Sequence, residues 1–192
     1  DVNDGEILID SVNIKHLRSD VLRKNIAIVL QDVFIFKGTL LENITLGRTD
    51  IPIENVYKAA KYLNAHDFIM SLPNGYDTEL TSEGSNLSLG QKQLISFVRA
   101  LVYNPKILLL DEATSSVDTN TESLIQEGIE KIMKGRTSIA IAHRLSTIIG
   151  CDRIFVLDRG KIIEEGNHEE LINKRGFYYE LYTTQFNEEL IN

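Results

Sequence analysis

Three apolar segments of strand length each run directly into a polar side chain that could act on a phosphate group. Gln31 follows the first segment, Asp111 and Glu112 follow the second, and His143 follows the third. One carboxylate of such a set can hold Mg²⁺, and the other can orient or deprotonate an attacking water. Gln and His side chains can position that water or a terminal phosphate. Any one of these residues could simply begin a loop, but the four together favour phosphate chemistry.

The segment Ser88-Leu89-Gly90-Gln91 is a second candidate. Ser followed three residues later by Gln, just before an apolar helical stripe, is the pattern of a helix-capping box. The same helix N-terminus could also bind an anion, because its first backbone N–H groups are free and the helix dipole is positive there. Gly90 would let a phosphate approach the backbone closely. We therefore expect a cap that can also serve as an anion site.

The elements that would position these groups alternate between strands and helices. Continuous apolar runs of strand length predict strands covered on both faces at Ile26–Leu30, Ile107–Leu110 and Ser138–Ala142. Amphipathic helices between such strands indicate a parallel α/β sheet with helices on both faces. The polar groups above would then meet at one edge, because ligands of open parallel sheets lie beyond the carboxyl ends of the strands.

The remaining elements are predicted from spacing and turn residues. Glu6–Asp10 alternates like a half-buried strand, and Ser19 or Asp20 would cap a short helix after it. The other expected elements are a helical stretch over 39–72, a loop over 73–86, a helix over 121–134, a hairpin over 153–165 turning at 158–160, and a helical tail over about 167–187.

Composition excludes several classes of protein. Lys and Arg number 20 against 28 Asp and Glu, which gives a formal net charge of −8 and argues against nucleic acid as a partner. The single Cys151 excludes an internal disulfide or a cysteine zinc cage and suits a reducing compartment. His16, His66 and His168 lack ligand spacing, so we expect them at the surface or in loops. No apolar run reaches the roughly 20 residues of a membrane-spanning helix, and no signal-peptide pattern opens the chain.

Five segments, in this order and spacing, resemble the nucleotide-binding domain of ABC transporters of the exporter type. They correspond to the Q-loop, the signature, the Walker B strand with its catalytic Glu, the D-loop and the switch histidine of that family. In this sequence they are Gln31–Phe36, Leu87–Gln93, Ile107–Glu112, Ser115–Asp118 and Ala142–Thr147.

The resemblance covers essentially the whole chain and implies its fold. It implies a P-loop NTPase-like (RecA-like), mostly parallel sheet with an α-helical signature subdomain. Residues 1–192 would form a single domain of this type, with the helical part at about 39–103 and the core in 1–38 and 104–192.

The resemblance also implies ATP and Mg²⁺ as cofactors and gives each residue a role. Asp111 would hold Mg²⁺ through water, Gln31 would contact the metal, Glu112 would be the general base and His143 would contact the γ-phosphate. On the surface that meets a second nucleotide-binding domain, Asp118 would cross the interface, and a nucleotide bound mainly by that domain would contact Ser88, Gly90 and Gln91.

Two features depart from the family pattern. The signature carries Leu89 where Gly is commonest, and the phosphate loop G-x-x-x-x-G-K-[ST] is missing, since no two of the 12 glycines lie five positions apart. In the family, this loop and a strand precede the segment that resembles Asp1–Asp10. The lost strand would lie between those at Ser138–Ala142 and Arg153–Leu157, so we expect exposed apolar faces there. We therefore expect a shortened chain, or one completed by another chain, that cannot bind or hydrolyse ATP alone.

The function implied is that of an ATP-hydrolysing motor of an ABC exporter. Its partners would be a transmembrane domain, docked on Val33–Leu46, and a second nucleotide-binding domain, and it would lie at the cytoplasmic face of the membrane. One alternative is a regulatory or binding module that does not hydrolyse ATP. Another is a DNA-repair type ABC ATPase, but such proteins usually carry long coiled-coil insertions and a basic surface.

Overall fold

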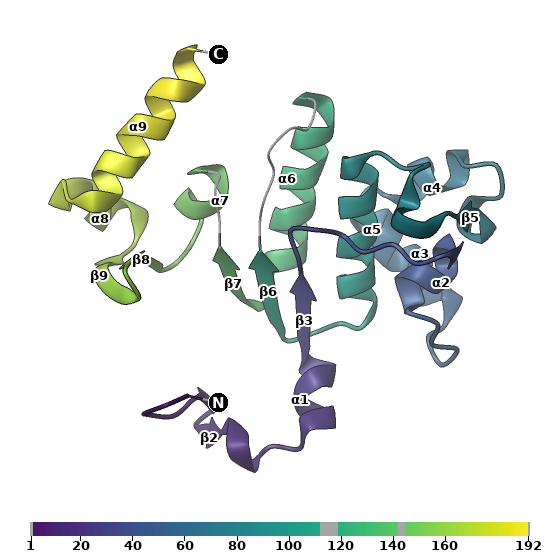
Figure 1. Ribbon diagram of the computed structural model, residues 1–192, viewed down its shortest axis with the longest axis horizontal. Coiled ribbons are helices and arrows are strands. Elements are labelled where there is room, and N and C mark those ends of the chain that lie inside the picture. The colour runs from purple at the N-terminus through teal and green to yellow at the C-terminus, as the bar shows by residue number, and fades with distance from the viewer. Residues whose placement is uncertain (1, 112–118, 142–144, 192) are drawn as a thin grey trace. The chain divides into compact units, whose positions relative to one another are not determined.

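A computed structural model describes residues 2–111, 119–141 and 145–191 of the chain (Figure 1). The chain forms two compact units, Asp1–Ile141 and Ala142–Asn192. The single domain expected from the sequence, with its helical part at about 39–103, stays a prediction.

The first unit contains a three-stranded parallel sheet. Its strands are β3 (Ile26–Val29), β6 (Ile107–Asp111) and β7 (Thr137–Ile141), in the order β3-β6-β7. Each is an apolar run with β-branched residues, as parallel strands usually are. The sheet and the helices that cross between its strands confirm the predicted α/β fold.

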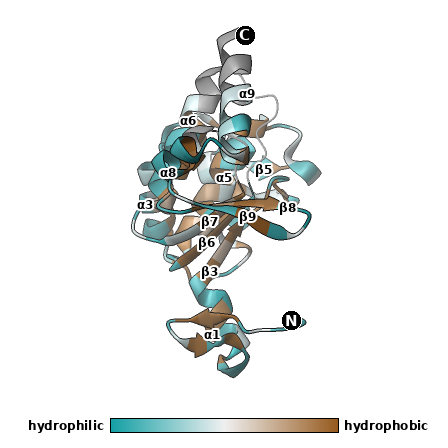
Figure 2. Ribbon diagram, turned by 90° about the vertical axis from the view of Figure 1, so that its left-hand side faces the viewer, coloured by the Kyte–Doolittle hydropathy of each residue, from teal (hydrophilic) through white to brown (hydrophobic). Residues whose placement is uncertain are grey.

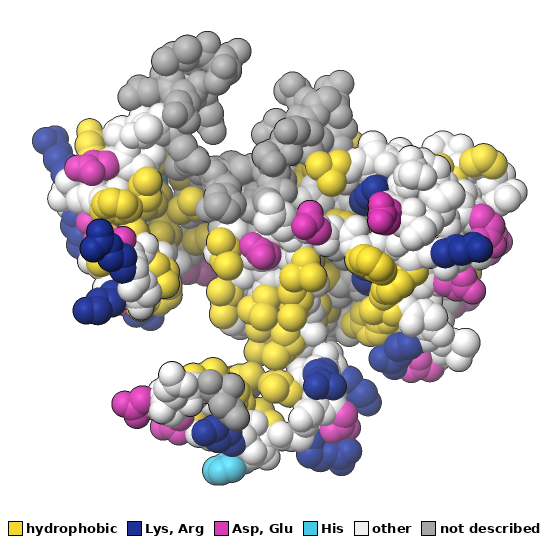
Figure 3. Space-filling view, viewed as in Figure 1, with side chains coloured by type: hydrophobic (Ala, Val, Ile, Leu, Met, Phe, Trp, Pro, Cys, Tyr) yellow, Lys and Arg dark blue, Asp and Glu magenta, His cyan; other side chains and the backbone are white. Residues whose placement is uncertain are grey.

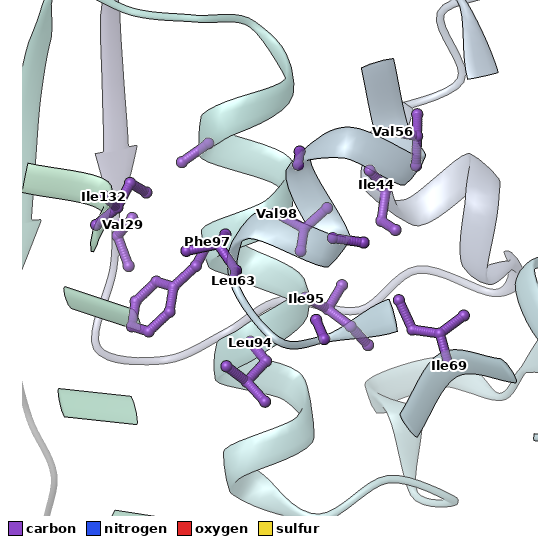
Figure 4. Packing of buried hydrophobic residues seen from close by; sticks show 14 of the residues in the cluster. Val29, Ile44, Val56, Leu63, Ile69, Leu94, Ile95, Phe97, Val98 and Ile132 are labelled. Atoms are coloured by element: carbon purple, nitrogen blue, oxygen red, sulfur yellow. The ribbon is translucent and has the colours of Figure 1, made fainter. Parts of the chain in front are cut away.

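One face of this sheet is covered by two long helices, α5 (Leu89–Val102) and α6 (Thr119–Met133). The inward side chains of the strands share one apolar cluster with residues of both helices. Figure 4 shows the α5 side chains Leu94, Ile95, Phe97 and Val98 at the centre of this cluster, with Phe97 beside Val29. Burial of these side chains stabilises the fold, at about 25 cal/mol per Å² of apolar surface removed from water.

The other face of the sheet is largely bare. Ile28 is 58% exposed, and Ile139 and Ile141 are each 61% exposed. Figure 2 colours β3, β6 and β7 as hydrophobic strands, and Figure 3 shows hydrophobic side chains gathered where Figure 1 places them. The prediction that β3 and β7 are covered on both faces was therefore wrong. Apolar runs cannot distinguish a strand buried on both faces from one that leaves an apolar face uncovered.

The helical stretch predicted over 39–72 is confirmed, but it is broken twice. It consists of α2 (Leu40–Thr45), α3 (Ile53–Tyr62) and α4 (His66–Ser71). Leu46 and Asn64 adopt positive φ angles of 53° and 56°, which end α2 and interrupt the chain between α3 and α4. Thr39 and Glu42 form a capping box at the start of α2.

The loop predicted over 73–86 contains short regular pieces. They are a 3₁₀ turn at Gly75–Asp77, the strand β5 (Glu79–Leu80) paired with β4 (Gly38–Thr39), and a 3₁₀ turn at Ser82–Gly84. The pairing of β4 with β5 fixes the start of α2 against this loop.

The N-terminal part forms a hairpin and a short helix. The hairpin pairs β1 (Leu8–Ile9) with β2 (Val12–Asn13), and after a 3₁₀ turn at Ile14–His16 the helix α1 spans Ser19–Asn25. The predicted cap at Ser19 or Asp20 was wrong, because Arg18 is the N-cap and makes no side-chain cap bond. The Arg18 guanidinium instead pairs with the Asp20 carboxylate at 2.9 Å.

The second unit contains the helix α7 (Leu145–Ile149), a hairpin and two further helices. The hairpin strands are β8 (Ile154–Asp158) and β9 (Lys161–Gly166), which confirms the predicted turn at 158–160. The predicted helical tail is two helices, α8 (His168–Lys174) and α9 (Phe177–Ile191). They break at Arg175, whose φ is 53°. Within the described part of the chain, no helix is both long and apolar enough to cross a membrane.

Candidate functional site

The carboxyl ends of the three parallel strands meet at one edge of the first unit. Leu110 is in register with Val29, and Asp111 is in register with Ile141. Gln31 follows β3 by two residues, so the backbone brings it to the same edge as Asp111. The predicted catalytic residues Glu112 and His143, and the interface residue Asp118, lie outside the described residues.

Asp111 is the last residue of β6 and its side chain is exposed, as is that of Gln31. Because Asp111 and Ile141 are register partners, both side chains project from the bare face of the sheet. Carboxylate and amide oxygens suit Mg²⁺ chemically. No group of three or more His, Cys, Asp or Glu side chains is arranged to hold a metal within the described ranges. A Mg²⁺ held by Asp111 and Gln31 would therefore need water or phosphate oxygens to complete its shell.

The helix α5 begins with the capping box predicted from the sequence. The Ser88 hydroxyl accepts from the Gln91 amide at 3.2 Å, and the Gln91 side-chain oxygen accepts from the Ser88 amide at 2.9 Å. The amides of Leu89 and Gly90 precede the first intrahelical bond of the helix, from Lys92 N–H to the Ser88 carbonyl. Gly90 carries no side chain at this turn, so a phosphate that reached it could approach these amides closely.

The segment after Gln31 carries two outward-facing aromatic rings. Phe34 is 63% exposed and Phe36 is 47% exposed, and their rings meet edge to face at 4.8 Å. Leu46, at the end of α2, is also exposed and has a positive φ, which is strained for a leucine. The segment Val33–Leu46 therefore presents large apolar side chains to solvent.

The side chain of Arg99 anchors this segment, and its role was not predicted from the sequence. Arg99 of α5 donates to the Phe34 carbonyl through both terminal nitrogens, at 3.1 Å each, and to the Asn43 carbonyl through Nε at 2.9 Å. Burial lowers the pKa of the Arg99 guanidinium. A signal was present, because Arg99 interrupts an apolar run from Leu94 to Val102, and a charge in such a place needs partners.

Two histidines expected at the surface or in loops are instead half-buried first residues of helices. His66 Nδ1 lies 2.9 Å from the Tyr76 hydroxyl, and His168 Nδ1 lies 2.8 Å from the Tyr178 hydroxyl. The expectation holds for His16, which is exposed. Burial, with a smaller effect of Tyr57, raises the pKa of Tyr76 to about 12. These His–Tyr pairs hold helices in place and lie on elements that carry none of the candidate site residues.

Comparison with known proteins shows which family this chain is similar to. Residues 1–115 match the model of a family described as "ABC transporter". An uncharacterized ABC transporter ATP-binding protein of Bacillus subtilis, YfiC, is 56% identical over 96% of this chain and 30% of its own length. A putative multidrug export ATP-binding/permease protein of Staphylococcus aureus is 51% identical over 96% of this chain and 32% of its own length.

The solved structure of a bacterial Atm1-family ABC exporter with ATP bound has the same fold. It is 44% identical to this chain, with a TM-score of 0.86, and the match covers 96% of this chain and 32% of that one. The chain thus spans about a third of the length of these relatives.

Proposed function

Because the chain belongs to the ABC transporter family, we propose that it is the ATP-binding motor domain of an exporter, which hydrolyses ATP to drive transport across a membrane. The relatives support this proposal, since one is named a multidrug export ATP-binding/permease protein and another is an exporter with ATP bound. The single observation that carries it is the common edge of β3, β6 and β7, where Asp111 ends β6 and Gln31 follows the neighbouring strand β3 by two residues.

The residues at this edge would divide the chemistry between them. Asp111 and Gln31 would hold Mg²⁺, which supplies positive charge to the phosphates when it is bound. Glu112, next to Asp111 in the chain, would accept a proton from the attacking water. His143, two residues after Ile141, would hold the γ-phosphate through its imidazole.

The start of α5 would serve a second nucleotide-binding domain. The N–H groups of its first turn, beside Ser88, Gly90 and Gln91, would bind a nucleotide held mainly by that domain. Asp118 would cross the interface between the two domains. Ser88 and Gln91 would keep this turn in shape, because their capping box fixes the backbone there.

The transmembrane partner would dock on Val33–Leu46. The exposed rings of Phe34 and Phe36, with Leu46 at the end of α2, offer apolar area for such a contact. A permease part is named in the Staphylococcus aureus relative, which supports a partner of this kind. Docking on a membrane domain would hold this chain at the cytoplasmic face of the membrane.

Residues 1–192 carry no glycine-rich phosphate loop of the form G-x-x-x-x-G-K. In P-loop enzymes that loop cradles the β- and γ-phosphates with backbone N–H groups and a Lys. We therefore expect ATP turnover from the complete protein encoded by the reading frame that contains these residues. The chain alone should not turn over ATP.

The test measures MgATP binding and hydrolysis by this complete protein and by its Asp111→Asn variant. We expect the variant to lose at least about tenfold in turnover and to require more Mg²⁺. The matched control is Asp158→Asn, at the end of β8, which should leave turnover unchanged. Binding of ATP without hydrolysis by the unmodified protein would favour the regulatory module instead. Failure to bind ATP would overturn the proposal.

A further inference from the structure

The side chains of the segment Phe34–Phe36 point alternately to solvent and into the core. The rings of Phe34 and Phe36 point outward, while Ile35 between them is 1% exposed and belongs to the apolar core. Ile35 packs so closely on Gly84 that a methyl group at Gly84 would lie 3.1 Å from it. A partner that pressed on the two rings would therefore move a backbone that is anchored inside the unit.

Three different elements hold the backbone of this segment. Arg99 of α5 donates to the Phe34 carbonyl, and the amide of Glu83 donates to the Ile35 carbonyl at 3.2 Å. The side chain of Asn43, on α2, accepts from the Phe36 amide at 2.8 Å and donates to the Phe36 carbonyl at 2.9 Å. Asn43 itself is 1% exposed. The segment is thus fastened to α2, to α5 and to the loop before α5.

Arg99 is the residue that connects these contacts to the candidate nucleotide site. Its Nε also donates to the Asn43 carbonyl, so one guanidinium ties both α2 and the segment to α5. Ser88, the N-cap of α5, lies about three helical turns from Arg99 on the same helix. Because a packed helix moves as a rigid body, a shift of the segment at Arg99 becomes a shift of the turn at Ser88.

We propose that Arg99 is a positioning residue that couples partner docking at Phe34–Phe36 to the N-terminal turn of α5. The inference rests on the proposed function, since it assumes that a partner docks at the two rings and that the turn at Ser88 meets a nucleotide. It adds the residue that connects the two rings to the turn at Ser88. Arg99 would act through the two carbonyls that it binds and through its place on α5, and its guanidinium lies 5.8 Å from the centre of the Phe36 ring.

The chemistry of the contact requires arginine rather than any cation. The planar guanidinium reaches the Phe34 carbonyl with two N–H groups and the Asn43 carbonyl with a third. A lysine keeps the charge, but its single ammonium cannot span both carbonyls in this way. Arg99→Lys therefore removes the connection and keeps the positive charge.

The experiment is a double-mutant cycle in the complete protein, with MgATP as the probe. Arg99→Lys should lower kcat at least about fivefold and leave KM for MgATP within about twofold. Phe34→Ala removes the outward ring and keeps the carbonyl that Arg99 binds. If Arg99 transmits the effect of docking on that ring, kcat of the double variant should fall no further than kcat of Arg99→Lys alone.

Arg136→Lys is the matched control. Arg136 also bonds backbone carbonyls, those of Pro105, Ile132 and Lys134, but it lies at the loop before β7. This variant should keep kcat, and its combination with Phe34→Ala should be additive. Additive losses for Arg99→Lys with Phe34→Ala, or an equal loss of kcat in Arg136→Lys, would overturn the inference.

Hydrogen exchange decides the inference even if the unmodified protein fails to hydrolyse ATP, a result that would count against the proposed function alone. Arg99→Lys should speed amide exchange in peptides covering 33–37 and also in those covering 87–92. Arg136→Lys should change neither. Faster exchange at 33–37 with unchanged exchange at 87–92 would show that Arg99 transmits nothing to the turn.

Discussion

Asn43 is almost completely buried, and its side chain makes hydrogen bonds to three backbone groups. It accepts from the Phe36 amide and donates to the carbonyls of Phe36 and Thr39. Buried polar groups that lose their partners cost more than the net value of the bonds themselves. The fixed geometry of the segment after Gln31 therefore depends strongly on this one amide.

We predict that Asn43→Leu lowers the free energy of unfolding by about 2–4 kcal/mol, because three backbone groups lose their partner. Urea unfolding followed by circular dichroism measures this change. Asn86→Ala is the control, since Asn86 is exposed and makes one long bond of 3.4 Å to the Glu79 carbonyl. That variant should stay within about 0.5 kcal/mol of the unmodified protein. An equal loss in the free energy of unfolding for the two variants would contradict the role given to the Asn43 side chain.

Tyr76 gives a prediction for alkaline pH. Its pKa is raised to about 12 in the folded chain, while an unfolded tyrosine ionises near pH 10. The stability from this shift is therefore complete below about pH 10 and is lost as the pH rises through 12. Burial also raises the pKa of Tyr103 and of Tyr178, so absorbance at 295 nm should show a late ionisation whose amplitude falls by one tyrosine in Tyr76→Phe and is kept in the control Tyr62→Phe. A Tyr76 that ionises near pH 10 in the folded protein would contradict its burial.

At the scale of elements, the start of α5 combines a structural cap with a candidate anion site. Asp caps helices as well as Ser does, and its charge is favourable beside the positive end of the helix dipole. The same charge would repel a phosphate. The two roles of Ser88 can therefore be separated by one substitution.

We predict that Ser88→Asp keeps the thermal stability of the complete protein and lowers its ATP turnover at least about tenfold, a loss of about 1.4 kcal/mol in transition-state stabilisation. Ser88→Thr, which keeps the cap without the charge, should lose less activity. Melting temperature and turnover, measured together, check both parts. Full activity of Ser88→Asp would remove this turn from the nucleotide site.

The elements show which features the sequence could predict. The ends of β3 and β6, near Gln31 and at Asp111, were predictable, because an apolar run stops where the strand leaves the core. The capping box at Ser88 was predictable, because it is local. The cap of α1 at Arg18 was not, since no side-chain bond marks it. The bonds of Arg99 were not, because they join residues more than fifty positions apart.

For the molecule as a whole, the bare face of the sheet was the feature least visible in the sequence. The strands β3 and β7 have the composition of fully buried strands. Within the described residues of the first unit, however, nothing covers the side chains of Ile28, Ile139 and Ile141. The expectation of exposed apolar faces agrees with Ile139, Ile141 and, in the second unit, Phe155 and Leu157. That expectation came from the family resemblance and not from the apolar pattern of the strands. Burial depends on what packs against a strand, and the pattern does not show this. An exposed apolar sheet face such as that of β3 and β7 normally meets another surface.

Glu112→Gln in the complete protein tests the central claim most directly, since it removes the proposed base and keeps the size of the side chain. Rapid-quench measurement of single-turnover ATP hydrolysis, with ATP affinity measured beside it, separates chemistry from binding. We predict that hydrolysis falls at least about a hundredfold while ATP affinity stays within about threefold. Hydrolysis at the rate of the unmodified protein, or no hydrolysis by either, would contradict a motor built on this edge of the sheet.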